Sequence, residues 1–334
     1  MRIPSKNVGR LTAGACALLL VLAGCSSSSS TQGGSSVAGT STSPTGSSNS
    51  VGSTSSAVTA GSGAQSPSSG AGGASGSSSS SQSAIGAPVS IDTLTPGTLC
   101  VGTTTDSKPY EYVDGTTLKG FDIDLVNAVA AKLNVKVNFV TQDFSALLAS
   151  VNNKQFDMAA ASIGITKKRQ ALVDFTDGYL VGYLGVLAFP NSGISDVKSV
   201  AGKRVAVLQG SIEDTYASTY IPDAQIVRFP DANSAFLALQ NKTVVAYFND
   251  YVVVQSFQEK YPNLKLVIPF KIPTLNLPAG WAVHKGNTQL ITALNGALKQ
   301  VVDDGTWTKL YKKWFPTVPM TPLPPYKVSS GGPN

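Results

Sequence analysis

Few residues of this chain could carry out acid–base, nucleophilic or metal chemistry. The single histidine, His284, follows an apolar stretch, so histidine-rich metal sites are excluded and Ser-His-Asp catalysis would depend on this residue alone. Asp122 and Asp124 are a close pair of carboxylates, but two positions apart at a helix start they do not face each other and suit the helix dipole. Phosphate-loop, dinucleotide-binding, CxxC, HExxH and GxSxG motifs are absent from the sequence. We therefore favour a small-molecule binding protein over an enzyme, with no catalytic residue, metal or cofactor.

The elements that must position such a binding site alternate between strand and helix from about residue 97 onward. Phe121, Leu125, Val129 and Leu133 stand four residues apart, which is the spacing of a helix with one apolar stripe. Strands are predicted at 98–102, 135–140, 156–160, 204–208, 225–229, 243–248, 264–268 and 280–284. Helices are predicted at 120–133, 144–151, 287–303 and 306–314, and from 211, 231 and 250, with Ser211 and Asp231 as N-caps.

This alternation predicts parallel sheets covered by helices on both faces. Two such series within about 225 residues indicate two α/β lobes. In that architecture ligands bind at the carboxyl ends of the strands, so the loops that follow strands are the places to search for a site.

The N-terminus has the pattern of an export signal. Residues 1–10 carry three cations and no anion, and residues 11–22 are uncharged and apolar over a length that is short for a membrane span. Leu22, Ala23, Gly24 and Cys25 resemble the bacterial lipoprotein processing box, in which cleavage precedes the cysteine and the cysteine carries the lipid. We expect a signal peptide over 1–24 and lipid on Cys25, which would anchor the protein on the extracytoplasmic face of the cell membrane. An ordinary signal peptide and a short uncleaved anchor are the alternatives.

The cysteines agree with this interpretation. Cys16 would leave with the signal peptide and Cys25 would carry lipid, so Cys100 would be alone in the mature chain and no intramolecular disulfide could form. Cys100 stands in an apolar run, which is typical of a buried small hydrophobic residue.

The composition of residues 25–92 predicts a tether. Residues 11–91 contain no Asp, Glu, Lys, Arg or His, and most of that stretch is Ser, Gly, Thr and Ala. Such a composition cannot bury enough apolar surface to fold, so we expect disorder, with ends roughly 40–50 Å apart. From residue 92 onward, 22 basic residues stand against 19 acidic ones, which gives no clustered basic surface for nucleic acid.

Several segments resemble one known family. TLCVGTTTDSKPYEYVD, KGFDIDLVNAVAAKL, FDMAAASIGITKKRQALVDFTDGY, KRVAVLQGS and DDGTWTKLYKKWF are similar to the polar amino acid-binding proteins of ABC importers, solute-binding protein family 3, over roughly residues 95–316. The resemblance implies a type II periplasmic-binding-protein fold, in which two α/β lobes are joined by two crossover strands. Lobe 1 would comprise 93–186 and 283–316 and lobe 2 would comprise 187–282, followed by a C-terminal tail over 317–334.

The resemblance also implies a set of ligand-binding residues. Arg169 matches the arginine whose planar fork suits the α-carboxylate of an amino acid, and Asp250 matches the acid that takes the ammonium. The remaining matches are carboxylate donors and an apolar wall: Ser162, the N–H of Gly164, Ser211 and Phe144. The residues alone leave plainer roles open, namely a surface arginine in the run KKR, an N-capping aspartate and a core phenylalanine.

Specificity positions depart from the family pattern. Ser107 stands where many members have an aromatic residue, and Thr104 stands where binders of basic amino acids often have an aspartate, although Asp106 is close enough to substitute in a shifted loop. We therefore expect a ligand like glutamine, glutamate or asparagine rather than a basic one. Lys108 could favour an acidic ligand, and the bulky Trp281 near the second crossover has no explanation from the sequence.

The resemblance implies a monomer that captures a polar amino acid and delivers it to the permease of an ABC importer. Two alternatives remain. The first is a lipoprotein sensor that signals amino acid levels to a membrane kinase. The second is an exported dehydratase of a prephenate-like acid on the same fold.

Overall fold

The computed structural model describes residues 91–221, 223–274, 277–320 and 323–327, which lie within one compact unit, Ser79–Asn334. The expected signal peptide, the lipid on Cys25, the tether up to residue 90 and part of the tail lie outside these residues, so they stay predictions. Within the described residues, no helix combines the length and the apolar character that crossing a bilayer requires.

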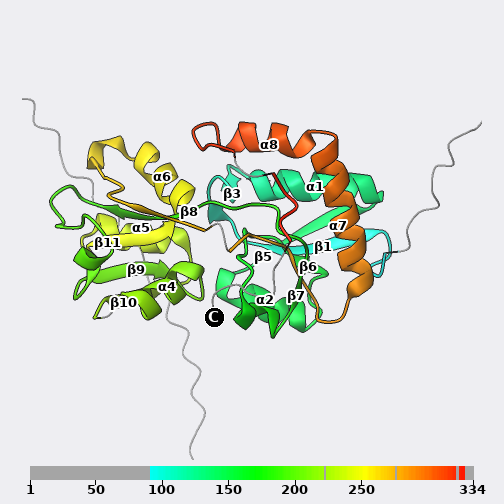
Figure 1. Ribbon diagram of the computed structural model, residues 1–334, viewed down its shortest axis with the longest axis horizontal. Coiled ribbons are helices and arrows are strands. Elements are labelled where there is room, and N and C mark those ends of the chain that lie inside the picture. Colours follow the sequence, from blue (N-terminus) through cyan, green and yellow to red (C-terminus); the bar gives the residue numbers. More distant parts are fainter. Residues whose placement is uncertain (1–90, 222, 275–276, 321–322, 328–334) are drawn as a thin grey trace, which may run out of the picture. The chain divides into compact units, whose positions relative to one another are not determined.

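The first lobe is built on a five-stranded sheet. Its strands, in spatial order, are β5 (Lys136–Thr141), β1 (Thr98–Thr103), β6 (Met158–Ala159), β13 (Ala282–Val283) and β7 (Asp174–Phe175). Helices α1 (Phe121–Leu133) and α7 (Thr288–Asp303) cover one face and α2 (Phe144–Asn152) covers the other (Figure 1). A small sheet of β2 (Asp106–Ser107), β3 (Glu111–Asp114) and β4 (Thr117–Lys119) precedes α1.

The second lobe has a five-stranded sheet of its own. Its strands, in spatial order, are β10 (Gln225–Phe229), β9 (Arg204–Leu208), β11 (Ala246–Asp250), β8 (Tyr183–Ala188) and β12 (Lys271–Pro273). The helices are α4 (Ile212–Tyr220), α5 (Ala232–Gln240) and α6 (Tyr251–Lys260), with short 3-10 turns η1 (Lys198–Val200) and η2 (Pro262–Leu264). The predicted α/β class is thereby confirmed.

Two strands correct the expectation of purely parallel sheets. β8 runs antiparallel to β11 and β12, and β13 runs antiparallel to β6 and β7. Both strands adjoin the places where the chain passes between the sheets, so each enters its sheet from the opposite direction to the local strand–helix series. The two passing segments pair with each other at Leu180 and Ala279. All of β8 pairs within the second sheet, so the expected lobe boundary at 186 falls inside this strand.

Local signals account for most element boundaries. Ser211 Oγ accepts the N–H of Asp214 and Asp231 Oδ1 accepts the N–H of Ser234, so both predicted N-caps are confirmed. The strand predicted at 264–268 is wrong. The chain forms η2 there and then a left-handed residue, Lys265, with φ of 52°, so only an isolated bridge at Val267 remains.

Side chains alternate between the two faces of the first sheet. Leu99 and Val101 of β1 are buried in the cluster that contains α1 and α7, whereas Cys100 between them packs with the cluster around α2. The sequence predicted that Cys100 is buried, whereas the structure shows it half-buried. Desolvation raises the pKa of its thiol.

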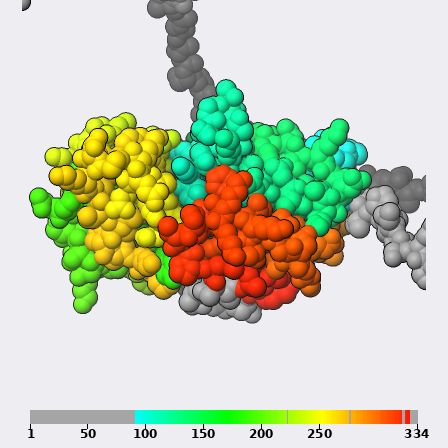
Figure 2. Space-filling view, turned by 90° about the horizontal axis from the view of Figure 1, so that it is seen from above, coloured from blue at the N-terminus to red at the C-terminus, as the bar shows by residue number. Residues whose placement is uncertain are grey.

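An aromatic cluster ties the C-terminal helix to α1. Phe121, fully buried, lies 5.0 Å from the Phe315 ring and 6.2 Å from the Trp307 ring, centroid to centroid. Trp307 belongs to α8 (Thr306–Trp314), and its indole N–H donates to the carbonyl of Tyr179. Seen from above, the orange-to-red side chains of the C-terminal helices form part of the outer surface (Figure 2). Trp281 also contributes, since its ring lies 5.2 Å from that of Tyr179.

Phe121→Ala should lower the free energy of unfolding by about 3–5 kcal/mol, because a large side chain at the centre of the cluster is replaced by a cavity. Urea unfolding followed by circular dichroism measures this change. Leu172→Ala is the control, since that side chain is 54% exposed and should change stability by less than about 0.5 kcal/mol. Equal effects of the two substitutions would contradict the assignment of this cluster as core.

Candidate binding site

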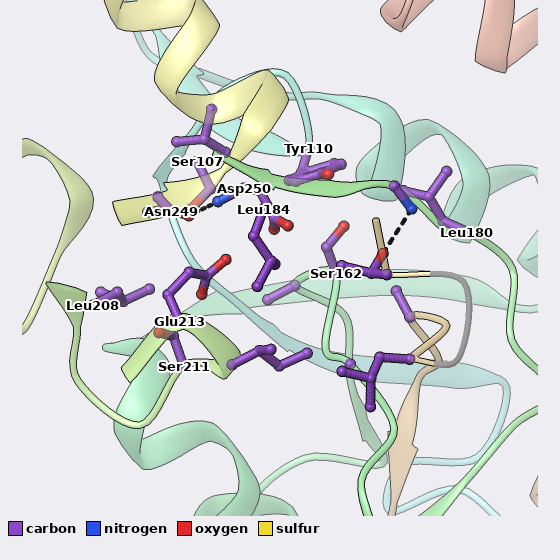
Figure 3. Close-up of a pocket in the computed structure, with 18 of the residues that line it drawn as sticks. Ser107, Tyr110, Ser162, Leu180, Leu184, Leu208, Ser211, Glu213, Asn249 and Asp250 are labelled. Carbon is purple, nitrogen blue, oxygen red and sulfur yellow. Dashed lines mark hydrogen bonds between the residues drawn. The ribbon is translucent and has the colours of Figure 1, made fainter. Parts of the chain in front are cut away.

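One cavity collects most of the residues that the sequence singles out. It contains about 670 Å³ of space not filled by atoms, a volume that includes open solvent at its mouth. Seven of the eight predicted ligand-binding residues line it: Ser107, Phe144, Ser162, Gly164, Arg169, Ser211 and Asp250. They come from both lobes, from strand ends, helix starts and the loops between them (Figure 3).

Arg169 is buried beside the cavity rather than exposed in a charged run. It lies in the short helix α3 (Lys167–Gln170), whose N-cap Thr166 accepts the Arg169 N–H. The guanidinium donates from Nη1 to the carbonyl of Gly164 at 2.7 Å and from Nη2 to the carbonyl of Gly210 at 2.9 Å. Its Cζ lies 5.5 Å from the centroid of the Phe144 ring. Burial lowers its pKa to about 10, so it remains a cation at neutral pH.

Small residues allow the two lobes to approach each other next to Arg169. A Cβ added at Gly164 would lie 2.0 Å from Cδ1 of Ile212 at the start of α4. The neighbouring Ser162 has a left-handed backbone, with φ of 44°, and its N–H donates to Oδ2 of Asp122. Ser211, the N-cap of α4, is buried on the opposite side of the cavity.

Three carboxylates line the cavity against one guanidinium. Asp250 is the last residue of β11 and the N-cap residue of α6, but its side chain makes no capping bond. Glu213, in the first turn of α4, and Glu111, in β3, are only 4% and 1% exposed. In Figure 3 the Glu213 carboxylate points into the cavity, with Asp250 above it. A ligand that carries positive charge would therefore relieve repulsion in this site.

Desolvation raises the pKa of each of these carboxyls. For Asp250 the main cause is burial, followed by repulsion from Glu213 and Asp122, while Arg169 opposes the shift. For Glu213 the main cause is again burial, opposed by hydrogen bonds and by Arg169. Such shifted groups cluster where a structure binds or reacts with a ligand.

Sequence reasoning missed Glu111 and Glu213. Glu213 follows the predicted N-cap Ser211 by two residues, and this first-turn position at a strand's carboxyl end was an available signal. Glu111 lies between two aromatic residues in a short strand, and no local pattern marks it as buried. Asp122 was interpreted only as a first-turn acid, yet it is fully buried beneath the cavity, whereas Asp124 binds Lys313 and Trp314 at the surface.

The side chains near the expected specificity positions differ in where they lie relative to the cavity. Thr104 is buried next to the cavity and not in its lining, and its hydroxyl donates to Oε1 of Glu111. Asp106 does not substitute for an acid at that position, because its carboxylate accepts the N–H groups of Ala232 and Asn233 at the start of α5. Lys108 is exposed, with its ammonium 5.5 Å from the centroid of the Tyr112 ring.

The residues that could support other chemistry lie elsewhere. His284 lines a different surface hollow with Lys154 and Asp157. In the described ranges, no group of three or more His, Cys, Asp or Glu residues is placed to hold a metal ion. The cavity itself can hold a small molecule with a carboxylate against Arg169 and one or more cationic groups against the three acids.

Known proteins match this chain over the same region. The model of the bacterial extracellular solute-binding proteins, family 3, matches residues 99–317. The arginine-binding extracellular protein ArtP of Bacillus subtilis (strain 168) is 30% identical over 222 residues, which cover 65% of this chain and 86% of that protein.

Solved structures of two proteins resemble the fold. An ancestral arginine-binding protein, solved with arginine and with glutamine bound, has a TM-score of 0.63 and 32% identity over 66% of this chain. The match covers 98% of the arginine-bound chain and 99% of the glutamine-bound one. The ancestral amino acid-binding protein AncCDT-1, a precursor of cyclohexadienyl dehydratase, has a TM-score of 0.59 and 32% identity over 66% of this chain and 96% of that one.

Proposed function

Because the chain belongs to the bacterial extracellular solute-binding proteins, family 3, we propose that it captures a free amino acid in this cavity and delivers it to an ABC importer. The observation that carries the proposal is that Arg169 and Asp250 line the same cavity, together with residues from both lobes. A free amino acid carries a carboxylate and an ammonium about one carbon apart. Removing both charges from water is costly unless each meets an opposite charge, and this cavity offers both.

Arg169 binds the α-carboxylate in this proposal. Two of its five N–H groups are committed to the carbonyls of Gly164 and Gly210, which fix the plane of the guanidinium. The others are left to meet a carboxylate, and a fork of fixed orientation suits that contact better than a mobile lysine. Ser162 and Ser211 supply hydroxyls on either side, and Asp250 takes the ammonium.

The chemical class of the ligand side chain can be inferred from the charges in the cavity. Ser107 and Thr104 led us to expect glutamine, glutamate or asparagine, and that class stays a candidate. The charges of the cavity favour a cationic side chain instead, since Glu213 remains after Asp250 is paired with the ammonium. Similar proteins are named for arginine, and one of them has been solved with arginine and with glutamine. We place the cationic class first.

A dehydratase is the second candidate activity, because AncCDT-1 shares the fold and is a precursor of such an enzyme. Turnover of prephenate or arogenate that is lost in Asp250→Asn would establish it.

Three further features stay predictions: lipid attachment at Cys25, the monomeric state, and the choice between import and sensing. Mass spectrometry of the mature N-terminus tests the first of these, and a pull-down of permease against kinase tests the last.

Arg169→Ala should weaken amino acid binding by about 100-fold, because the α-carboxylate would lose its buried partner. Isothermal titration calorimetry with the ligand identified by screening measures this loss. Lys168→Ala is the matched control, since this neighbouring side chain is exposed and should leave affinity unchanged. An unaltered affinity in Arg169→Ala, with the fold intact by circular dichroism, would reject the assigned carboxylate site.

A thermal-shift screen against the twenty amino acids, ornithine and citrulline should show the largest stabilisation with arginine, lysine or ornithine. A ligand at 100 times its dissociation constant adds about 2.7 kcal/mol, which is several degrees for a domain of this size.

Glu213→Gln should reduce the affinity for the cationic ligand by about 10- to 100-fold and should change the affinity for glutamine little.

Glu259→Gln, at the exposed end of α6, is the control for that substitution. Stabilisation by glutamine, glutamate or asparagine alone would return the ligand to the class expected from Ser107 and Thr104. Stabilisation by no amino acid, on protein first freed of carried-over ligand, would overturn the proposed function.

A further inference from the structure

Two carboxyl groups from different elements meet beneath the cavity. Glu111, in β3, is 1% exposed, and Asp122, in the first turn of α1, is fully buried. One oxygen of each has partners. Glu111 Oε1 accepts the hydroxyl of Thr104 at 2.8 Å, and Asp122 Oδ2 accepts the N–H of Ser162 and the hydroxyl of Tyr179.

The second oxygen of each group has no donor. Glu111 Oε2 and Asp122 Oδ1 are both buried, and neither has a hydrogen-bond partner in the described part of the chain. The N–H of Asp122 donates to the carbonyl of Tyr110, the residue before Glu111, at 3.0 Å, so the chain holds the two acidic residues next to each other. Two carboxylates can only accept, so their approach is repulsive when both are ionised and becomes a hydrogen bond when one of them carries a proton.

We propose that Glu111 and Asp122 share a single proton between Oε2 and Oδ1, and that this pair acts as a positioning unit for Ser162 of the binding loop. One added hydrogen satisfies both orphan oxygens at once and removes one of two adjacent buried charges. The remaining negative charge rests on the oxygens that accept from Thr104, Ser162 and Tyr179. The proton's presence follows from the protein alone, while its effect on ligand affinity rests on the proposed function.

Ser162 needs such support. Its left-handed backbone, with φ of 44°, is unfavourable for a residue with a side chain and persists only where neighbours hold it. The bond from its N–H to Asp122 fixes the loop that also presents Gly164 and Arg169. Tyr179, the other donor to Asp122, precedes Leu180, where the two crossing segments pair. The pair thus joins the binding loop to the connection between the lobes.

The surroundings favour retention of the proton. Burial is the main cause that raises the pKa of Glu111 well above its usual range, with Asp122, Asp106 and Asp250 adding repulsion. Burial likewise raises the pKa of Asp122 to about 6, against the hydrogen bonds that it accepts. Other titratable groups that face the pair are Tyr110 and Tyr179, both held neutral by burial.

Infrared difference spectroscopy of the full mature chain counts the proton directly. The carbonyl band of a protonated carboxylic acid should disappear in Glu111→Gln, in Asp122→Asn and in the double variant, with the same loss of amplitude in all three. Each introduced amide can donate to the partner carboxylate, so the fold is kept. Protonated acids elsewhere contribute equally to every spectrum and cancel, and Asp124→Asn on the exposed side of α1 should change nothing.

A loss in the double variant that equals the sum of two separate single losses would show two protons, and no loss in any variant would show none. Either result overturns the proposal. Both can be obtained without any ligand, so they are independent of whether an amino acid binds.

The pH profile supplies a second readout. Because the folded pKa values are raised, the stability that the pair contributes is present at acid pH and is lost as pH rises through its folded pKa. The melting temperature should therefore fall more steeply as pH rises above about 4, the pKa of an unfolded carboxyl group, in the wild type than in Glu111→Gln. Where a ligand is known, Glu111→Ala should weaken its binding by at least 10-fold and Glu111→Gln should restore it. Parallel pH profiles, or failure of the glutamine variant to restore binding, would count against a shared proton.

Discussion

The cost of keeping charge out of water governs this molecule. Arg169, Glu213 and Glu111 are each less than one-tenth exposed, and Asp250 is half-buried, yet all four border one cavity. Such a cluster persists only if each group is held by hydrogen bonds to the protein, by a proton or by an opposite charge. The carbonyls of Gly164 and Gly210 hold Arg169, and Thr104 holds Glu111. The loops after the strands are shaped to supply these partners.

The two-lobe architecture is what makes this arrangement possible. A single α/β sheet gathers loops at one edge, but two sheets that face each other across a cavity can present opposite charges from different parts of the chain. Arg169 comes from the first lobe, while Asp250 and Glu213 come from the second. Gly164 of the first lobe leaves room for the terminal methyl of Ile212 of the second, so a small residue helps the two lobes to meet at this junction.

The sequence was sufficient for the fold class, and most of the site residues that it singled out line the cavity, because local patterns mark both. Apolar spacing marked the helices, and side-chain caps such as Ser211 and Asp231 marked where two of them begin. It was insufficient for Glu111, Glu213 and Asp122, because burial of a charged residue depends on what lies opposite to it in space. The same holds for Thr104 and Asp106, whose partners are a neighbouring strand and the start of α5. The error at 264–268 has a local cause, since Lys265 adopts a left-handed backbone that no strand accommodates.

Asp106 has a consequence for kinetics. Its carboxylate, from β2, accepts N–H groups at the start of α5, and Arg169 donates to Gly210, so protein atoms alone link the two lobes. A ligand that leaves the cavity when the lobes separate must wait until these hydrogen bonds break, although the ligand itself takes part in none of them. Residence time and equilibrium affinity are then set partly by different residues. Natural variation at Asp106 could lengthen or shorten the life of the complex while the groups that recognise the ligand stay the same.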